Sequence, residues 1–281
     1  MHIHTLYQRK KPVLSCEVFP PKPGGNIETV SRAIDGIAAL SPDFMSVTYG
    51  AAGRGNFGTV AVAETLQRRH GVTALAHLTC VNATEAETDG IVSEIKQAGI
   101  ENILALRGDL PEGADPNARR DFRYASDLIA RLSGRGFSIG AAAYPEGHID
   151  CESLDESIRH LRLKVESGAQ FLLSQLFFDN DLFLRFLDKA GSLGLPISAG
   201  IMPILSRSQI ERMIFLCGAS LPAGVIRLLN RYARDEQSLR LAGIDYACRQ
   251  AEDLAVRGAD GIHIYAMNRV EVAQAVLRAL R

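Results

Sequence analysis

Eight short apolar runs recur along the chain, and a polar side chain stands at or just beyond the carboxyl end of most of them. Segments with helical hydrophobic spacing, flanked by Gly or Pro, separate the runs. Strand alternating with helix predicts a parallel sheet, and eight such units can close into a (β/α)8 barrel. The expected strands are residues 13–19, 44–48, 74–78, 102–106, 137–143, 171–175, 197–201 and 261–265.

The length of the chain fits one such barrel. A (β/α)8 barrel needs about 250 residues, and the chain has 281, of which 47% are hydrophobic. The long gap before the last strand contains two helical stretches, residues 223–232 and 236–257. We read these stretches as additions to the barrel, so that residues 1–281 form a single α/β domain.

Charge and composition restrict the partners. The formal net charge is −1 and no basic block occurs, which argues against nucleic acid or an anionic membrane surface as a ligand. No run approaches 18 apolar residues, and the amino terminus lacks an apolar signal segment, so we expect a cytoplasmic protein. The five cysteines lie far apart without a C-x-x-C pair, which predicts reduced thiols.

The polar residues at the strand ends are the candidates for chemistry. In the first strand Val13, Ser15 and Glu17 share one face, because side chains two apart point the same way. Glu17 would therefore point into the barrel near its mouth; by itself it could equally be a solvated carboxylate, but other polar residues converge there. These residues are Thr48, His77, Arg107, Asp109, Tyr144, Gln175 and Tyr265.

Two weaker patterns are interpreted structurally. Residues 53–58 match G-x-G-x-x-G, but the following strand lacks the carboxylate that a dinucleotide site needs, so we expect a flexible loop over the barrel mouth. His77 and Cys80 have no partner cluster with metal-ligand spacing, so no metal site is expected. The polar stretch 112–123 could act as a lid.

Seven motifs in order along the chain resemble those of the bacterial methylenetetrahydrofolate reductases. They extend from the first strand to the last, and their agreement in order is far more specific than any one of them. The motifs are EVFPP from Glu17, SVTYG from Ser46, AHLTC from Ala76, ALRGDLP from Ala105, YASDL from Tyr124, AYPE from Ala143 and YAMNR from Tyr265.

The resemblance implies a (β/α)8 barrel that binds FAD without a covalent bond. Members of this family reduce 5,10-methylenetetrahydrofolate to 5-methyltetrahydrofolate, and NADH or NADPH supplies the hydride through the flavin. The two substrates would use the same face in turn. The small-molecule partners would therefore be folate and nicotinamide, and a homo-oligomer is expected.

The resemblance also implies roles for two carboxyl groups. Glu17 would be the general acid that protonates N10 of the folate, and burial at the mouth should raise its pKa so that it holds a proton near neutral pH. Asp109 would contact the pterin and lie close to the flavin, where its charge affects redox poise and folate binding. The alternative for Asp109 is a turn residue that caps the loop.

Other positions match the family's binding residues. His77 could instead fill the core, and Lys164 could be a solvated helix residue. Gln175 would hydrogen-bond either substrate, while Arg269 would pair with the glutamate carboxylate of the folate. The matched FAD-binding residues are Thr48, His77, Arg107, Gly108, Asp109, Tyr124, Ala125, Tyr144, His148 and Lys164, and the matched substrate-binding residues are Gln175, Gln209, Tyr265 and Arg269.

Two departures and two rival functions accompany the resemblance. Ser157 stands where some members have an aspartate on the adenosine side, and Met213 where some have an aromatic residue over the nicotinamide. One rival is the same barrel receiving electrons from a protein partner. The other is a non-catalytic subunit that binds folate or flavin, although a mere carrier has no need for an acid at Glu17.

Overall fold

The structure is a computed structural model of the whole chain. It describes residues 1–21, 27–49, 58–110, 113, 115 and 120–281, apart from the side chains of Ile27 and Thr29. Most of the glycine motif at 53–58 and about half of the polar stretch 112–123 lie outside the described residues, so the expected loop over the mouth and the expected lid remain predictions.

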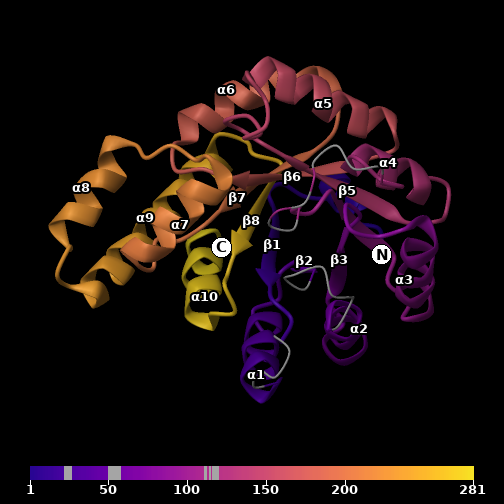
Figure 1. Cartoon of the computed structure of the whole chain (residues 1–281). Coiled ribbons are helices and arrows are strands. Elements are labelled where there is room, and N and C mark those ends of the chain that lie inside the picture. Colours follow the sequence, from indigo (N-terminus) through magenta and orange to yellow (C-terminus); the bar gives the residue numbers. More distant parts are fainter. Residues whose placement is uncertain (22–26, 50–57, 111–112, 114, 116–119) are drawn as a thin grey trace.

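Within the described residues, eight parallel strands close into a barrel in sequence order (Figure 1). Each strand pairs with its neighbours in the sequence, and the first strand pairs with the last. The predicted (β/α)8 fold is therefore confirmed. The strands are β1 (Val13–Val18), β2 (Phe44–Val47), β3 (Thr73–Thr79), β4 (Asn102–Leu106), β5 (Ser138–Ala143), β6 (Phe171–Leu176), β7 (Ile197–Ile201) and β8 (Gly261–Tyr265).

Helices surround the strands on the outside of the barrel (Figure 1). The two helices expected before the last strand are present as α8 and α9, with α9 packed against β7, β8 and α10. The helices are α1 (Ile27–Ala38), α2 (Thr59–His70), α3 (Glu85–Gln97), α4 (Ala125–Leu132), α5 (Leu154–Glu166), α6 (Asn180–Ala190), α7 (Arg207–Cys217), α8 (Ala223–Arg231), α9 (Glu236–Val256) and α10 (Val270–Ala279), with short 3-10 turns η1 (Ile3–Gln8) and η2 (Gly191–Leu193).

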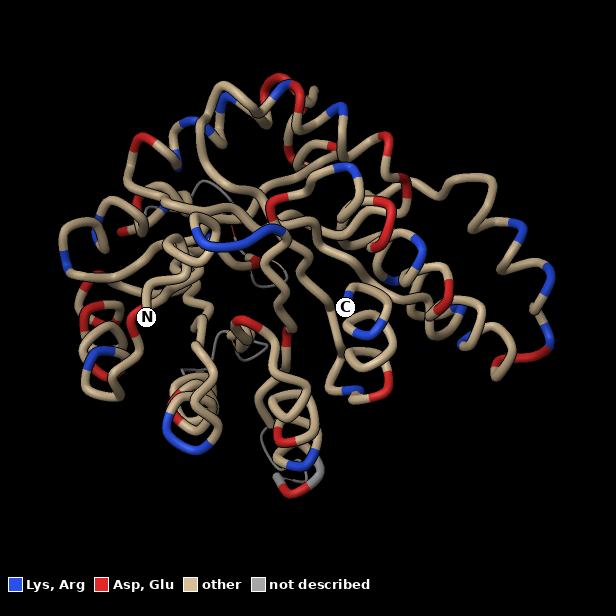
Figure 2. The backbone as a smooth tube through the Cα atoms, turned by 180° about the vertical axis from the view of Figure 1, so that it is seen from behind, with Lys and Arg blue, Asp and Glu red and all other residues tan. Residues whose placement is uncertain are grey.

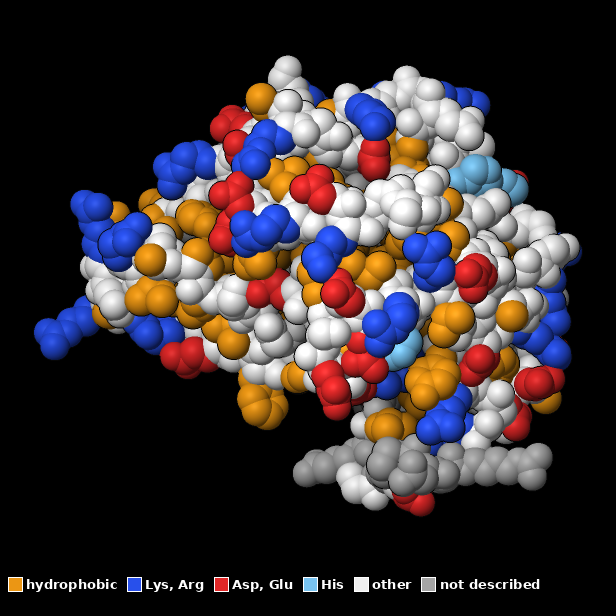
Figure 3. Space-filling model, turned by 90° about the horizontal axis from the view of Figure 1, so that it is seen from above, with side chains coloured by type: hydrophobic (Ala, Val, Ile, Leu, Met, Phe, Trp, Pro, Cys, Tyr) orange, Lys and Arg blue, Asp and Glu red, His pale blue; other side chains and the backbone are white. Residues whose placement is uncertain are grey.

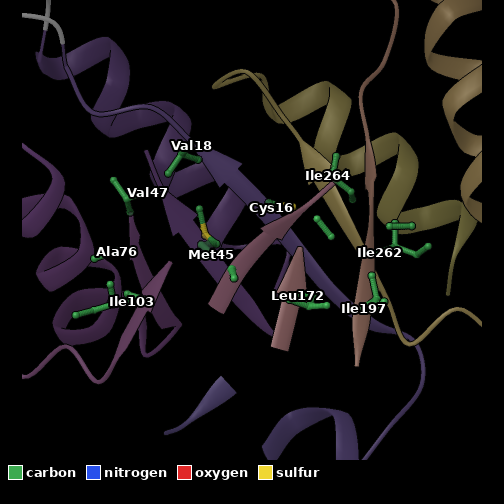
Figure 4. Close-up of a cluster of buried hydrophobic side chains, with 14 of the residues drawn as sticks. Cys16, Val18, Met45, Val47, Ala76, Ile103, Leu172, Ile197, Ile262 and Ile264 are labelled. Atoms are coloured by element: carbon green, nitrogen blue, oxygen red, sulfur yellow. The ribbon is translucent and has the colours of Figure 1, made fainter. Parts of the chain in front are cut away.

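The outward faces of the strands form the main core. In β1 Cys16 and Val18 point toward the helices, as the alternation predicts, and both are fully buried. Met45, Ile103 and Ile262 do the same in other strands (Figure 4). Burial of a full aliphatic side chain contributes about 1.5–3 kcal/mol, so this layer holds the helices on the barrel.

The inward faces change character along the barrel axis. At the amino-terminal end of the strands, η1 closes the barrel and packs with an apolar cluster. Toward the carboxyl-terminal end, polar inward side chains such as Glu17, His77 and Gln175 replace most of the apolar ones. The apolar cluster, here called the bottom plug, consists of Ile3, Leu6, Tyr7, Val13, Phe44, Leu75, Leu104, Phe171 and Leu173.

The outside of the protein is mixed in charge. Positions occupied by Lys and Arg are interspersed with positions occupied by Asp and Glu along the surrounding helices (Figure 2), and the face seen from above mixes both signs with apolar side chains (Figure 3). Among the described helices, none is long and apolar enough to cross a membrane.

Candidate functional site

Glu17 lies inside the barrel mouth, on the face predicted from strand alternation. It is 8% exposed, and its Oε2 lies 3.6 Å from His77 Nε2 on β3 and 3.6 Å from His263 Nε2 on β8. Since β1 is hydrogen-bonded to β8 on one side and β2 on the other, the backbone fixes the carboxyl group within this cluster. Glu17, His77 and His263 are called the mouth cluster below.

The pKa of Glu17 differs from the expectation. Burial does raise it, but hydrogen bonding from His263 and the nearby imidazoles of His77 and His263 act against burial and lower the pKa overall. The expectation that burial alone would keep this carboxyl group protonated was wrong, because it omitted His263. A hydroxyl of Ser46 also lowers the pKa by hydrogen bonding.

His77 fills part of the barrel interior, yet it faces the carboxyl group directly. It is 6% exposed, and burial lowers its pKa to about 4, so the imidazole is neutral near pH 7. Its Nε2 is buried and has no hydrogen-bond partner among the described residues. A buried polar atom without a partner costs stability, so this atom is suited to meet a ligand.

A second feature is a cavity of about 380 Å³ at the carboxyl ends of β4 and β5, bounded by α4 and α5. Six of the ten residues expected to bind FAD line it, so the fold brings them together. The cavity combines cationic and hydroxyl groups with apolar walls such as Leu161 and Phe186, a set that fits an anionic ligand with a flat ring. The six residues are Arg107, Tyr124, Ala125, Tyr144, His148 and Lys164.

Lys164 is not the solvated helix residue of the alternative interpretation. Its Nζ donates a hydrogen bond to the carbonyl oxygen of Ala142 at 2.8 Å and lies 5.4 Å from the centre of the Tyr144 ring. Burial lowers the pKa of Lys164 to about 8 and raises that of Tyr144 to about 12. Lys164 therefore presents a cation to the cavity near neutral pH, and Tyr144 presents a neutral hydroxyl.

Other polar groups in the cavity are held by local contacts. Arg107 pairs with Asp150 at 3.0 Å, and Tyr144 packs edge-on against His148 with ring centres 4.6 Å apart. Burial lowers the pKa of His148, and the charge of Asp150 opposes that shift. These contacts orient the side chains without removing them from the cavity lining.

Position 108 requires glycine. Its φ is +84°, and a Cβ there would lie 2.9 Å from the Cβ of Thr79, so a larger residue would clash as well as strain the backbone. The turn at Gly108 places Asp109 on the surface beyond β4, where its backbone oxygen accepts a hydrogen bond from Asn82. The charge of Asp109 contributes to the raised pKa of Tyr144.

The residues expected to bind substrate are less closely connected. Tyr265 follows His263 on the inward face of β8 and donates to the carbonyl oxygen of Ser174. Gln175 accepts a hydrogen bond from its neighbour Leu176, and Arg269 lies 3.7 Å from Glu271 at the start of α10. Gln209 on α7 has a buried Nε2 without a partner among the described residues, a donor suited to a ligand.

Not every expected FAD residue lines the cavity. Thr48, His77, Gly108 and Asp109 lie outside its lining, although all four stand in or directly after β2, β3 or β4, toward their carboxyl ends. In the described part of the chain, no group of three His, Cys, Asp or Glu side chains could hold a metal ion, and all five cysteines are free.

Comparison with known proteins decides the family. Residues 2–281 match the family described as methylenetetrahydrofolate reductase. The chain belongs to the methylenetetrahydrofolate reductase family. It is 33% identical over 270 residues to the 5,10-methylenetetrahydrofolate reductase of Escherichia coli, covering 95% of this chain and 90% of that protein. It is 32% identical over 271 residues to the enzyme of the same name from Pectobacterium carotovorum, covering 95% and 89%.

Two further similarities concern a longer relative and a solved structure. Methylenetetrahydrofolate reductase 1 of Schizosaccharomyces pombe is 33% identical over 279 residues, which cover 97% of this chain but 46% of that protein. Among solved structures, an uncharacterized protein from Clostridium thermocellum that binds two copies of 5-methyl-5,6,7,8-tetrahydrofolic acid has a TM-score of 0.68 at 15% identity, covering 98% of this chain and 95% of that one. At that identity the likeness concerns the barrel alone.

Some residues of the site escaped sequence analysis. His263 was missed although it shares the inward face with Tyr265 two positions on, a pattern that could have revealed it. Cys151 and His160 also line the cavity, with Sγ and Nδ1 3.5 Å apart, and no sequence motif indicated them. The two departures from the family lie in different places. Ser157 lines the cavity, and its Oγ accepts a hydrogen bond from the backbone N–H of His148 at 3.1 Å. Met213 packs against an apolar cluster over the carboxyl end of the barrel.

Proposed function

We propose that this protein reduces 5,10-methylenetetrahydrofolate to 5-methyltetrahydrofolate, using non-covalent FAD and a reduced nicotinamide. The observation that carries the proposal is the convergence of family motif residues on one end of the barrel. Six of the matched FAD-binding residues line a single cavity, and Glu17 lies buried at the barrel mouth.

The chemistry that FAD would supply at this site is hydride transfer from the nicotinamide to the folate. The residues of the chain would bind the cofactor and the substrates and would protonate the folate. Arg107 and Lys164 supply positive charge and His148 supplies a hydrogen-bond donor, which suit the pyrophosphate and ribityl groups, and the apolar wall suits the adenine.

Glu17 would deliver the proton that opens the imidazolidine ring of the folate. Protonation of N10 lets the bond from N10 to the bridging carbon break, and the carbon remains on N5 as an iminium that can accept hydride. Asp109 would stabilise that positive charge, while Gln175, Gln209, Tyr265 and Arg269 would hold the pterin and glutamate parts of the substrate.

The first test is identification of the cofactor. Protein purified under native conditions should be yellow, and acid extraction followed by chromatography should release FAD. Recovery of FMN, or failure to bind any flavin after incubation with excess FAD, would refute the cofactor assignment.

The second test is an anaerobic spectrum before and after addition of NADH or NADPH, followed by methylenetetrahydrofolate. We expect one nicotinamide to bleach the flavin and the folate to restore its colour. Bleaching by dithionite but by neither nicotinamide, with folate still restoring the colour, would instead support delivery of electrons by a protein partner. Failure of folate to restore the colour would contradict the proposed reaction and favour a binding subunit.

A further inference from the structure

The inference concerns His263, which carries no role in the proposed reaction so far. It is 1% exposed and lies at the middle of β8, below the mouth. Both ring nitrogens have a defined neighbour. Nδ1 lies 2.7 Å from Ser15 Oγ, its partner across the β1–β8 ladder, and Nε2 lies 3.6 Å from Glu17 Oε2 and 3.4 Å from Ser46 Oγ.

The contact with Ser15 determines how His263 can carry protons. A distance of 2.7 Å between nitrogen and oxygen requires one hydrogen between them. Ser15 can accept that hydrogen bond because its own hydroxyl can turn toward the carbonyl oxygen of Ile262, 3.5 Å away. With a hydrogen on Nδ1, the lone pair on Nε2 faces the carboxyl group of Glu17. For the pair to act as an acid, it must carry one further proton, either on Nε2 or on the carboxyl group.

We propose that His263 and Glu17 together hold the acid proton of the reaction, with Ser15 as the acceptor that lets the imidazole carry it. This inference rests on the proposed function and assigns His263 as a positioning residue, since it acts through Glu17. The lowered pKa of Glu17, which conflicts with a solitary acid, is what such a pair produces.

The proton balance is simple. At rest the pair is a carboxylate beside an imidazolium, or equally a carboxyl group beside a neutral imidazole, and its net charge is zero in both forms. If the proton lies on Nε2, it passes first to Glu17, and Glu17 then gives this same proton to N10 of the folate. The pair is left with one negative charge opposite the new iminium, and a proton from solvent restores it.

The other titratable groups that face Glu17 leave this role to His263. His77 on β3 is held neutral, because burial, together with a smaller contribution from His263, outweighs the charge of Glu17 and lowers the pKa of His77 to about 4. Tyr265 on β8 packs edge-on against His263, and burial raises the pKa of its phenol well above the usual value. Of the groups in the mouth cluster, His263 is therefore the one left to share the acid proton with Glu17.

A spectroscopic test does not depend on the reaction. Nitrogen-15 NMR of histidine-labelled protein, as purified, reports which ring nitrogens carry protons, and the spectrum of His263→Asn identifies the signals of His263. We expect a doubly protonated or proton-sharing ring in the wild type near pH 7 and a neutral ring in Glu17→Gln. A neutral ring in both proteins would overturn the inference even if folate reduction is confirmed.

A kinetic test follows the pH profile of each half-reaction. Burial raises the pKa of Glu17 and His263 lowers it, so in His263→Asn the carboxyl group would titrate alone and the alkaline fall of the folate half-reaction should move away from its wild-type position. Ser15→Ala should move it in the same direction by less. Reduction of the flavin by nicotinamide should keep its profile in both variants.

Ser198→Ala is the matched control, since it removes another buried barrel hydroxyl, one that bonds Tyr7 at the bottom plug. It should leave the pH profile unchanged. Equal losses in both half-reactions of His263→Asn and Ser15→Ala, with unmoved profiles, would show a purely structural role. If the wild type fails to reduce the folate, the proposed function is refuted, whereas the NMR result still decides whether the pair shares a proton.

Discussion

The two ends of the barrel interior use the same strands for opposite purposes. On β1 the inward residues are Val13, Ser15 and Glu17, running from an apolar bottom through a hydroxyl to an ionisable group at the mouth. On β8 they are Gly261, His263 and Tyr265. In a (β/α)8 barrel the amino-terminal end serves stability and the carboxyl-terminal end serves chemistry, and here the change occurs within two residues of one strand.

The difference teaches what each end tolerates. At the bottom plug, close packing decides stability, so the volume of each side chain matters. At the mouth, the ionisable groups are buried together, and their mutual charges and hydrogen bonds determine their protonation. Substitutions at the two ends should therefore separate stability from catalysis.

The largest effect is expected for Glu17→Gln. A neutral side chain of the same size cannot protonate N10, and general acids contribute about 100- to 10,000-fold to rate. Stopped-flow kinetics under anaerobic conditions should show this loss in the folate half-reaction, with flavin binding and nicotinamide oxidation nearly intact. Equal losses in both half-reactions would return Glu17 to a structural role.

The next effect is on stability, at the opposite end of the barrel. Phe171 is fully buried in the bottom plug, with its ring 6.2 Å from that of Tyr7, and Phe171→Ala should lower the free energy of unfolding by about 3–5 kcal/mol. Denaturant titration measures the loss. The turnover number of the protein that remains folded should change little. A large loss of turnover would show that the bottom plug also shapes the barrel mouth.

The matched control for this prediction is Phe215→Ala. Phe215 on α7 is 83% exposed, so its truncation should change the free energy of unfolding by no more than about 0.5 kcal/mol. A loss as large as that of Phe171→Ala would mean that Phe215 is buried against another molecule in solution.

Asp109→Asn should have an intermediate effect confined to the mouth. Loss of a charge-assisted hydrogen bond should weaken folate binding by about 1.5–3 kcal/mol. Removal of a negative charge should also raise the flavin midpoint potential, so the folate half-reaction slows more than reduction by nicotinamide. Asp188→Asn, an exposed carboxylate on α6, is the control. Unchanged potential and affinity would leave Asp109 as a turn residue.

The fold was readable from the sequence because local patterns determine it. Apolar runs such as residues 102–106, 197–201 and 261–265 coincide with β4, β7 and β8, since a strand buried on both faces is apolar along its length. Runs 13–19 and 44–48 extend one residue too far. Phe19 leaves the ladder, and its backbone bonds the Asn268 side chain instead.

The site was only partly readable, because protonation depends on contacts between distant strands. Alternation placed Glu17 on the inward face, but it could not show that His77 and His263 lie equally close to its carboxyl group. The sign of the pKa shift therefore came out wrong. The burial of Lys164 was hidden for a similar reason, since a helical lysine is usually solvated until a cavity is seen beneath it.

The smallest predicted effect tests the cavity at β4 and β5 through its pH dependence. Burial lowers the pKa of Lys164 to about 8, so its amine is a cation at pH 7 and loses its charge as the pH rises through about 8. An anionic flavin pyrophosphate should therefore bind less tightly above pH 8, with about a tenfold loss between pH 7 and pH 9. Titration of deflavinated protein with FAD measures this loss. Lys164→Met should bind weakly throughout and lose this part of the pH dependence, whereas Lys96→Met on the exposed face of α3 should keep it. The same pH dependence in Lys164→Met as in the wild type would assign the titration to another group and remove Lys164 from contact with the pyrophosphate.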